Sequence, residues 1–130
     1  MIISKATGYG IRALAYLANQ PRDRLCGLEE IASHEHIPPV FLRKVLGELR
    51  RHRLLRSVKG IHGGYGLARE PGSISLWEVV HTLDPEPDCD TCVLGLGLCS
   101  QENTCSLHGD WQKIREAWII LLKSKTIAEI

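Results

Sequence analysis

A glycine-rich turn between two short apolar segments constrains the fold of this 130-residue chain more than any other feature. Leu54–Val58 has the residue types of a β-strand, Gly60–Gly64 is rich in residues that accept a positive φ, and Tyr65–Ala68 suits a returning strand. Pro71 and Gly72 then close the unit as a second turn. The sequence therefore predicts a two-stranded hairpin.

Three helical segments are expected before this hairpin. Apolar residues at helical spacing predict a helix over about 4–19, which Ser4 can cap. A shorter helix is expected over 28–33. A third helix is expected to open at Pro38 and Pro39, because proline is well tolerated at the first helical position.

The third helix is expected to bury one side and to present basic side chains on its other faces. Its expected buried stripe consists of Phe41, Leu42, Val45, Leu46 and Leu49. Two short helices, the second of them basic and exposed, suggest a helix-turn-helix, and a hairpin directly after it makes a winged helix. The expected fold class is mainly α with a small β-hairpin, a winged helix-turn-helix followed by a long C-terminal dimerisation helix.

The rest of the chain divides into a helix, an irregular segment and a terminal helix. Ser75 and Glu78 form the pattern of a capping box at the start of the first of these helices. Residues 84–109 carry acids, glycines and four cysteines without a clear period. We therefore expect a winged-helix domain over 1–83, a cysteine-rich loop over 84–109 and a dimerisation helix over 110–130.

The terminal helix carries a seam of large apolar side chains at spacings of three, four and three residues. Its members are Trp111, Ile114, Trp118 and Leu121. Two tryptophans on one stripe of a terminal helix usually pack against a partner helix, which favours a homodimer. Packing onto the same chain is the alternative.

Charge is distributed very unevenly, although the formal net charge is only +1. Residues 43–69 contain eight basic side chains and one acidic side chain, whereas residues 70–110 contain eight acidic side chains and no lysine or arginine. An ordinary solvated helix face mixes the two signs. The basic stretch therefore indicates a surface for a polyanion, and a winged helix makes that polyanion double-stranded DNA, most simply a palindromic operator.

The expected DNA-binding side chains lie on the third helix and in the hairpin turn. They are Val40, Arg43, Lys44, Arg50, Arg51, Lys59 and His62. The first three stand early in the helix, where side chains meet base edges in a major groove. The two arginines near the helix end are expected to contact phosphates, and the last two residues to enter a minor groove.

Four of the five cysteines lie close together in the irregular segment, and a histidine follows them. The candidate metal ligands are Cys89, Cys92, Cys99, Cys105 and His108. Thiolates and imidazole suit iron–sulfur clusters, zinc or copper(I), and the spacing alone does not choose among them. Disulfides are disfavoured in a cytosolic chain. Cys26 stands apart and is expected to be a buried or incidental thiol.

Several classes of protein are excluded by the sequence. No run of 18 apolar residues exists, so nothing is expected to span a membrane. The N-terminal residues lack the layout of a signal peptide, and we expect a cytoplasmic protein. No phosphate loop, paired-carboxylate pocket or nucleophile–base pair can be defended, so an enzyme is not expected.

Three segments together resemble the Rrf family of bacterial winged-helix transcription regulators, of the IscR and NsrR type. They are the N-terminal run from Ile3 to Leu14, the wing from Ser57 to Ala68, and the Cys99-x5-Cys105-x2-His108 run. The resemblance covers essentially the whole chain. It implies a homodimer crossed through the long C-terminal helix and a [2Fe–2S] or [4Fe–4S] cluster held by three cysteines, whose state switches DNA binding.

The chain departs from the family pattern at the cluster ligands and at the DNA-reading positions. Cys99 and Cys105 keep the spacing of the family, whereas Cys92-x6-Cys99 is one residue longer. The fourth ligand is either Cys89 or His108, and both alternatives stay open. Arg43 stands where the iron–sulfur regulator of the family carries an acid, and Lys59 replaces its wing arginine, so its operator sequence does not carry over.

These observations predict a DNA-binding transcription regulator, most simply a repressor, that senses iron, redox or nitric oxide status through an iron–sulfur cluster. A zinc site or a thiol–disulfide switch in place of the cluster is the first alternative. A small metal-carrying or electron-transfer protein is the second, and an absence of salt-dependent DNA binding would favour it.

Overall fold

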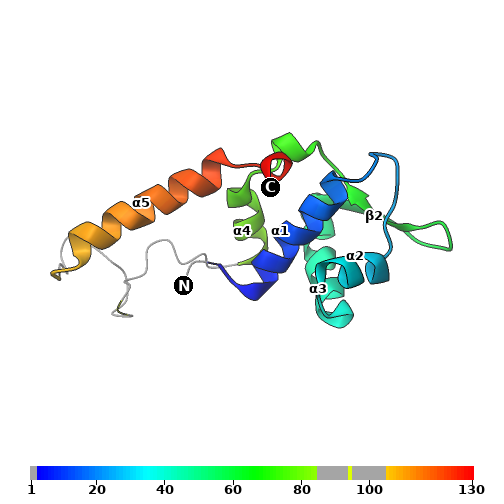
Figure 1. Ribbon diagram of the computed structural model, residues 1–130, viewed down its shortest axis with the longest axis horizontal. Helices are drawn as coiled ribbons and strands as arrows, with labels where there is room; N and C mark the ends of the chain where they lie inside the picture. The colour runs from blue at the N-terminus through cyan, green and yellow to red at the C-terminus, as the bar shows by residue number, and fades with distance from the viewer. Residues whose placement is uncertain (1–2, 85–93, 95–104) are drawn as a thin grey trace.

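The computed structural model describes residues 3–84, 94 and 105–130 (Figure 1). Its elements in chain order are α1 (Lys5–Ala18), α2 (Leu28–Glu35), α3 (Pro39–Arg51), β1 (Leu55–Val58), β2 (Gly64–Leu67), η1 (Pro71–Ser73), α4 (Leu76–Leu83), α5 (His108–Ser124) and η2 (Ile127–Glu129). The fold is mainly α with one antiparallel hairpin, which confirms the expected fold class.

Local signals explain where α1 and α3 begin and end. The Ser4 hydroxyl accepts a hydrogen bond from the Thr7 backbone nitrogen at 3.1 Å, as expected for a residue that caps a helix. Pro39 occupies the first turn of α3. At the other end of α3, Arg53 lies in the left-handed region with φ 63°, and the Leu54 nitrogen donates to the Leu49 carbonyl at 2.9 Å. This is a Schellman ending with arginine where glycine is usual.

One apolar core joins α1, α2, α3, the hairpin and α4. Leu14, Ile31, Leu46 and Leu54 are among its fully buried members. The expected stripe of α3 is buried at Leu42, Val45, Leu46 and Leu49. The prediction for Phe41 is wrong: this side chain is 41% exposed, because it stands at the edge of the core with its ring 5.4 Å from that of Tyr9.

The hairpin is bonded to a third segment of backbone along the outer edge of β2. Leu55 pairs with Leu67 and Val58 with Gly64. On the far side of β2, Cys26 donates to Tyr65 at 2.9 Å and accepts from it at 2.7 Å. Gly64 has φ 149°, and a Cβ there would lie 2.7 Å from the Cys26 carbonyl oxygen. Only glycine therefore allows this close approach.

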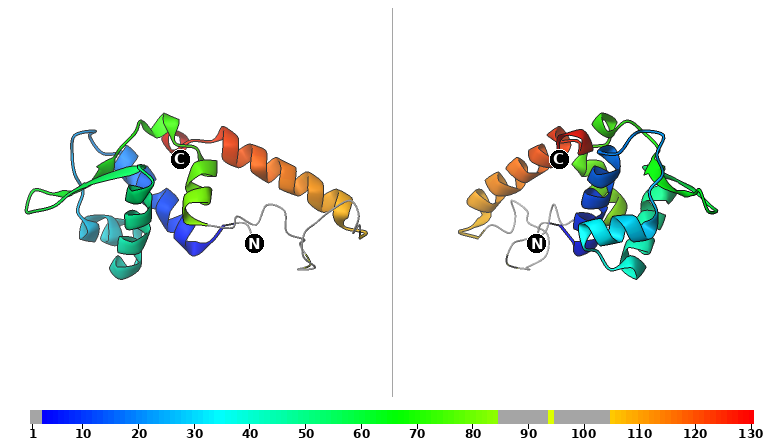
Figure 2. Two further views of the ribbon diagram at one scale, coloured as in Figure 1. Left: turned by 180° about the vertical axis from the view of Figure 1, so that it is seen from behind. Right: turned by 45° about the vertical axis from the view of Figure 1, so that its right-hand side comes forward.

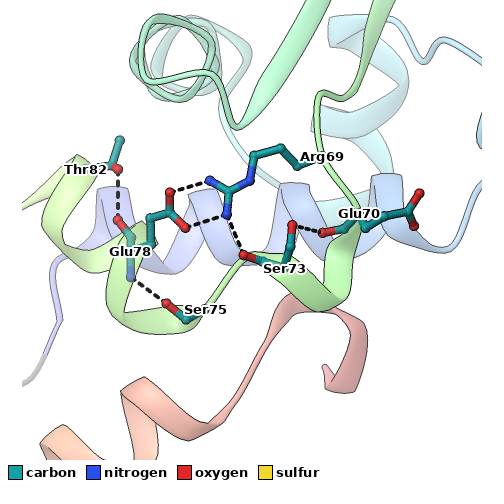
Figure 3. Close-up of polar contacts among 6 residues, drawn as sticks. All are labelled: Arg69, Glu70, Ser73, Ser75, Glu78 and Thr82. Carbon is teal, nitrogen blue, oxygen red and sulfur yellow. Dashed lines mark hydrogen bonds and ion pairs between the residues drawn. The ribbon is translucent and has the colours of Figure 1, made fainter.

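A bidentate ion pair ties the chain after the wing to α4 (Figure 3). The Arg69 guanidinium donates to both carboxylate oxygens of Glu78, at 2.5 and 3.0 Å, and to the Ser73 carbonyl. Ser75 caps α4 through the Glu78 nitrogen at 3.1 Å. The expected capping box is therefore only half formed, because the Glu78 carboxylate faces Arg69 instead of the start of its own helix.

The terminal helix α5 projects from the domain, and the wing projects at the opposite end (Figures 1 and 2). The C-terminal end of α5 is anchored by buried Leu122. Just beyond the helix, Ile127 is also buried, and its nitrogen donates to the Ile74 carbonyl at 2.9 Å. The helix begins at His108 and ends at Ser124, and the chain beyond it turns back to the core as η2. None of the helices in the described ranges is long and apolar enough to cross a membrane.

Candidate nucleic-acid interface

The face of α3 that points away from the core is continuous and exposed. Its members recur at spacings of three and four residues and are Val40, Arg43, Lys44, Gly47, Arg50 and Arg51. Val40 is 75% exposed although it is apolar. The buried stripe occupies the other side of the same helix, so the periodicity that builds the core also determines which side chains face outward. The structure thus brings together all five predicted residues of this helix.

Most of the positive charge on this face is not neutralised. Arg51 forms an ion pair with Glu48 one turn away, with 2.6 Å between nitrogen and oxygen. Within the described ranges, no carboxylate forms an ion pair with Arg43, Lys44 or Arg50. Exposed cations without internal partners attract phosphates and release the counterions of DNA on binding.

Contacts from α1 fix the orientation of α3. Arg12 of α1 donates to the Glu35 carbonyl at the end of α2, and its Nε lies 3.6 Å from the Glu35 carboxylate. His36 adopts φ 55° in the turn between α2 and α3. Tyr9 of α1 packs edge-on against Phe41 of α3. The aromatic and basic residues of α1 therefore brace the turn and the first residues of the helix that would enter DNA.

The tip of the wing is a tight turn that presents two cationic or ionisable side chains and one apolar side chain. The Gly63 nitrogen donates to the Gly60 carbonyl at 3.0 Å, which places Ile61 and His62 at the two central positions. Lys59 and His62 are exposed, and Ile61 is 98% exposed. A Cβ on Gly63 would collide with the Val58 carbonyl, so the turn depends on glycine there.

A partly buried polar network lies between α1, α2 and the root of the wing. Arg24 donates to both carboxylate oxygens of Glu30, at 2.8 and 2.9 Å, and Tyr16 donates to the same carboxylate at 2.5 Å. The hydrogen bonds from Arg24, and then those from Tyr16, lower the pKa of Glu30 to about 2. Burial, with a smaller contribution from Glu30, raises the pKa of Cys26 to about 11. Cys26 is therefore a buried neutral thiol.

Of the candidate metal ligands, Cys89, Cys92 and Cys99 lie outside the described residues. Cys105 is a free, exposed thiol. The His108 nitrogen donates to the Cys105 carbonyl at 3.1 Å, so both residues belong to the turn that opens α5. In the part of the chain with described positions, no three His, Cys, Asp or Glu side chains form a metal-binding group. Cys105 and His108 are both donors that iron–sulfur clusters use, and their chemistry fits such a group.

The predicted seam of α5 is partly uncovered in the single chain. Ile114 is 59% exposed and Leu121 is 42% exposed, while Trp111 and Trp118 are half-buried. Leu122 is the one buried side chain of this fully described helix. The seam therefore offers apolar area that α5 does not pack against its own domain.

A hydrogen bond that the sequence did not predict joins α1 to Asp84, the first residue of the expected cysteine-rich loop. The fully buried Thr7 hydroxyl donates to Asp84 at 2.7 Å, and the Ser4 nitrogen lies 3.4 Å from the same oxygen. Gly10 makes room for Leu83, because a Cβ at this position of α1 would collide with that side chain. No local signal in the sequence reveals the hydrogen bond between Thr7 and Asp84, since 77 residues separate them.

Comparisons with known proteins agree with this architecture. A predicted HTH-type transcriptional regulator of Aquifex aeolicus is 37% identical over 132 residues, covering 100% of this chain and 91% of that protein. The structure of CymR, the global cysteine regulator of B. subtilis, is 24% identical with a TM-score of 0.81, covering 98% of this chain and 93% of that one. T. potens IscR is 25% identical with a TM-score of 0.74, covering 98% and 84%.

The family comparison covers nearly the whole chain. Residues 3–130 match the Rrf2 family, described as an iron-dependent transcriptional regulator. The winged helix, the exposed basic face of α3 and this match agree, and they make the protein a DNA-binding transcriptional regulator and not an enzyme. This chain belongs to the Rrf2 family of transcriptional regulators.

Proposed function

We propose that the protein is a cytoplasmic, homodimeric repressor that binds a palindromic operator and releases it when the state of an iron–sulfur cluster changes. The observation that carries the DNA-binding part is the outward face of α3, where Arg43, Lys44 and Arg50 are exposed and form no ion pair with a described carboxylate. A repressor needs no further surface, since occupation of a promoter is sufficient to block it.

The proposed role of each DNA-binding side chain follows from its position on the surface of α3 or the wing. Val40, Arg43 and Lys44 lie in the first half of α3, where an arginine can bond a guanine and a valine can touch a thymine methyl group. Arg50 and Arg51 lie near its C-terminal end, where phosphate contact is the natural role. Lys59 and His62 at the wing tip are suited to an adjacent minor groove.

A selection experiment tests site-specific binding. Duplexes selected from a random pool by the unaltered protein would be bound with an affinity that falls as salt rises. Arg43→Ala should weaken binding and relax preference at one or two base positions, whereas Arg50→Ala should weaken all duplexes alike and lower the salt slope by about one. Lys5→Ala, an exposed lysine at the start of α1, is the matched control. If no duplex is enriched, the proposed DNA-reading function is wrong.

The cluster part of the proposal assigns Cys92, Cys99 and Cys105 as ligands, with Cys89 or His108 as the fourth. It is supported by the placement of Cys105 and His108 on one turn at the start of α5, and by the description of the family as iron-dependent. An iron–sulfur cluster supplies a centre that changes charge or is lost in response to iron supply, redox state or nitric oxide.

The residues around Asp84 provide a physical route from the cysteine segment to DNA. Asp84 is the first residue of that segment and accepts a hydrogen bond from Thr7 of α1, and α1 contacts the end of α2 through Arg12 and the start of α3 through Tyr9. A shift at Asp84 would alter the support of the recognition helix. Because the spacing of two half-sites on DNA is fixed, a small rotation can change affinity greatly.

The test of sensing compares one protein in two states. Anaerobic protein with its cluster and the same protein stripped by chelator should differ at least tenfold in affinity for a selected duplex. Cys105→Ala should behave like the stripped protein in both preparations. Comparing Cys89→Ala with His108→Ala identifies the fourth ligand, because only one of them should change the visible spectrum. Equal affinities in the two states would contradict cluster sensing while leaving DNA binding intact.

A thiol–disulfide switch is the second candidate, and the exposed free thiol of Cys105 favours it. Metal-free protein would then change its DNA affinity on treatment with a mild thiol oxidant, and a reductant would reverse the change. A zinc site in place of the cluster predicts colourless protein whose zinc content falls in Cys105→Ala. Cluster sensing predicts neither result.

A further inference from the structure

We propose that Ile61 is an apolar wedge at the tip of the wing that enters the minor groove of the operator and selects sites with a deformable base step. The inference rests on the proposed DNA-binding function and goes beyond it by assigning a specificity role to a side chain that carries no charge. It names the step geometry of DNA, not a base edge, as the feature that this part of the protein reads.

The turn holds Ile61 in an exposed position at the tip of the wing. The hydrogen bond from the Gly63 nitrogen to the Gly60 carbonyl makes Ile61 and His62 the two central residues. Gly60 has φ 106°, and Gly63 leaves no space for a Cβ. Both glycines suit a tight turn, and Ile61 near its centre has 98% of its surface exposed. Central turn positions usually hold Gly, Pro, Asn, Asp or Ser, and an exposed isoleucine there contributes nothing to the core.

The root of the wing is braced on two sides, so the tip is carried by a supported arm. The backbone of Cys26 pairs with Tyr65 on the outer side of β2. Arg69 holds the chain just beyond β2 to Glu78 of α4 (Figure 3). The hairpin then extends beyond the helices at the end of the molecule away from α5 (Figure 1). A rigid root can direct a small apolar group to a defined depth in a groove.

The surroundings of Ile61 match a minor groove better than a protein surface. Lys59 precedes it and His62 follows it, and both are exposed. Lys59 can meet the phosphates that border a narrow groove while the uncharged side chain between them faces the sugars and base edges. An apolar group inserted there partly unstacks a base step, and pyrimidine–purine steps resist this least. The wing would therefore favour such a step without a hydrogen bond to it.

The test uses a duplex selected from a random pool by the unaltered protein, with 2-aminopurine placed in turn at each step of the segment that the wing protects. We expect binding to raise the fluorescence at one step, because unstacking relieves quenching. Ile61→Ala should abolish that rise and weaken affinity about tenfold, with an unchanged slope of log affinity against log salt. Lys59→Ala should instead lower the slope by about one.

Two variants control for the fold of the turn and for the loss of any exposed isoleucine. Ile61→Leu keeps an apolar side chain of the same size and should retain the fluorescence rise. Ile130→Ala removes an exposed isoleucine outside the wing and should change neither quantity. Unchanged affinity in Ile61→Ala, or weakened affinity with the fluorescence rise intact, would overturn the proposal. A failure to select any duplex would instead contradict the DNA-reading function itself.

Discussion

Gly47 occupies the middle of the exposed face of α3, a position where glycine weakens a helix. Nothing lies within 4 Å of the place where a Cβ would stand. Gly47→Ala should therefore raise the free energy of unfolding by about 0.5–1 kcal/mol, since alanine restricts the unfolded chain and fits the helix. Urea unfolding at one fixed protein concentration measures the change. A loss of stability would show that this face is more crowded than its exposed position indicates.

The same substitution separates stability from DNA binding. The added methyl group points toward the surface that would meet DNA, between Lys44 and Arg50 along the helix. A close fit of α3 in a groove predicts weaker DNA binding by a more stable protein. A glycine in this place is consistent with a backbone that approaches another molecule closely.

Glu30 should make stability depend on acid pH. Its pKa in the folded protein is about 2, against a usual value of 4.5, because Arg24 and then Tyr16 donate to the carboxylate. A lowered folded pKa contributes stability that is present above about pH 4.5 and is lost as the pH falls toward 2. The difference in unfolding free energy between the unaltered protein and Glu30→Gln should be largest near pH 6 and shrink at pH 3.

Glu29 provides the matched control for this titration. It is the neighbouring exposed glutamate of α2, and it forms no ion pair with any residue whose position is described. Glu29→Gln should alter stability little at either pH. A constant difference between Glu30→Gln and the unaltered protein from pH 6 to pH 3 would contradict the role given to the Arg24–Glu30 pair.

Between elements, a buried hydroxyl of α1 bonds the residue that caps the C-terminal end of α4. Thr7 donates to the Asp84 carboxylate at 2.7 Å and is fully buried. Thr7→Val keeps the shape and removes the donor, so it should lower the free energy of unfolding by about 1–3 kcal/mol. Thermal or urea unfolding checks this value.

Thr82→Val is the control for that prediction. The Thr82 hydroxyl donates to the Glu78 carbonyl within its own helix at 2.9 Å, so its loss leaves no partner in another element unsatisfied. It should cost much less than Thr7→Val. Equal decreases in the free energy of unfolding for the two variants would show that the Thr7–Asp84 hydrogen bond does not contribute more than a bond within one helix.

The elements with local signals are the ones that sequence reasoning predicts well. Ser4 and Ser75 cap α1 and α4, and Pro39 opens α3, because caps and prolines act within one turn of chain. The hairpin follows from Gly60 and Gly64, whose positive φ values the turn requires. The exposed face of α3 is simply the complement of its buried stripe.

The contacts that sequence reasoning misses join residues far apart in the chain. The pairing of Cys26 with Tyr65 and the bond from Thr7 to Asp84 have no local pattern, since tertiary packing alone creates them. The sequence predicts Glu78 as half of a capping box, but Arg69 binds its carboxylate. The expected helix over 110–130 ends early, because Ile127 finds a place in the core.

At the scale of the whole molecule, α5 exposes an apolar seam that a second copy would cover. Trp118→Ala should reduce the mass in solution from that of a dimer to that of a monomer, because it removes a large apolar side chain near the centre of the seam. Analytical ultracentrifugation at micromolar concentration measures this directly. Glu116→Gln, an exposed residue outside the seam, should leave the dimer intact.

Loss of the dimer should also reduce operator affinity. Two recognition helices on one dimer bind two half-sites. A monomer therefore lacks the additional affinity that simultaneous binding of both half-sites provides. The wing and α5 extend in opposite directions (Figure 2), which leaves the DNA-reading elements clear of the seam. A monomeric unaltered protein, or a dimeric Trp118→Ala variant, would contradict this arrangement.

We propose that the cysteine segment holds an iron–sulfur cluster. The most direct measurement is the content of iron, acid-labile sulfide and zinc per chain in protein purified without oxygen, beside Cys105→Ala prepared in the same way. We expect iron and sulfide in about equal amounts, with two or four of each per chain for the two cluster types, and their loss in the variant. Zinc alone, or no metal after reconstitution with iron and sulfide, would contradict it.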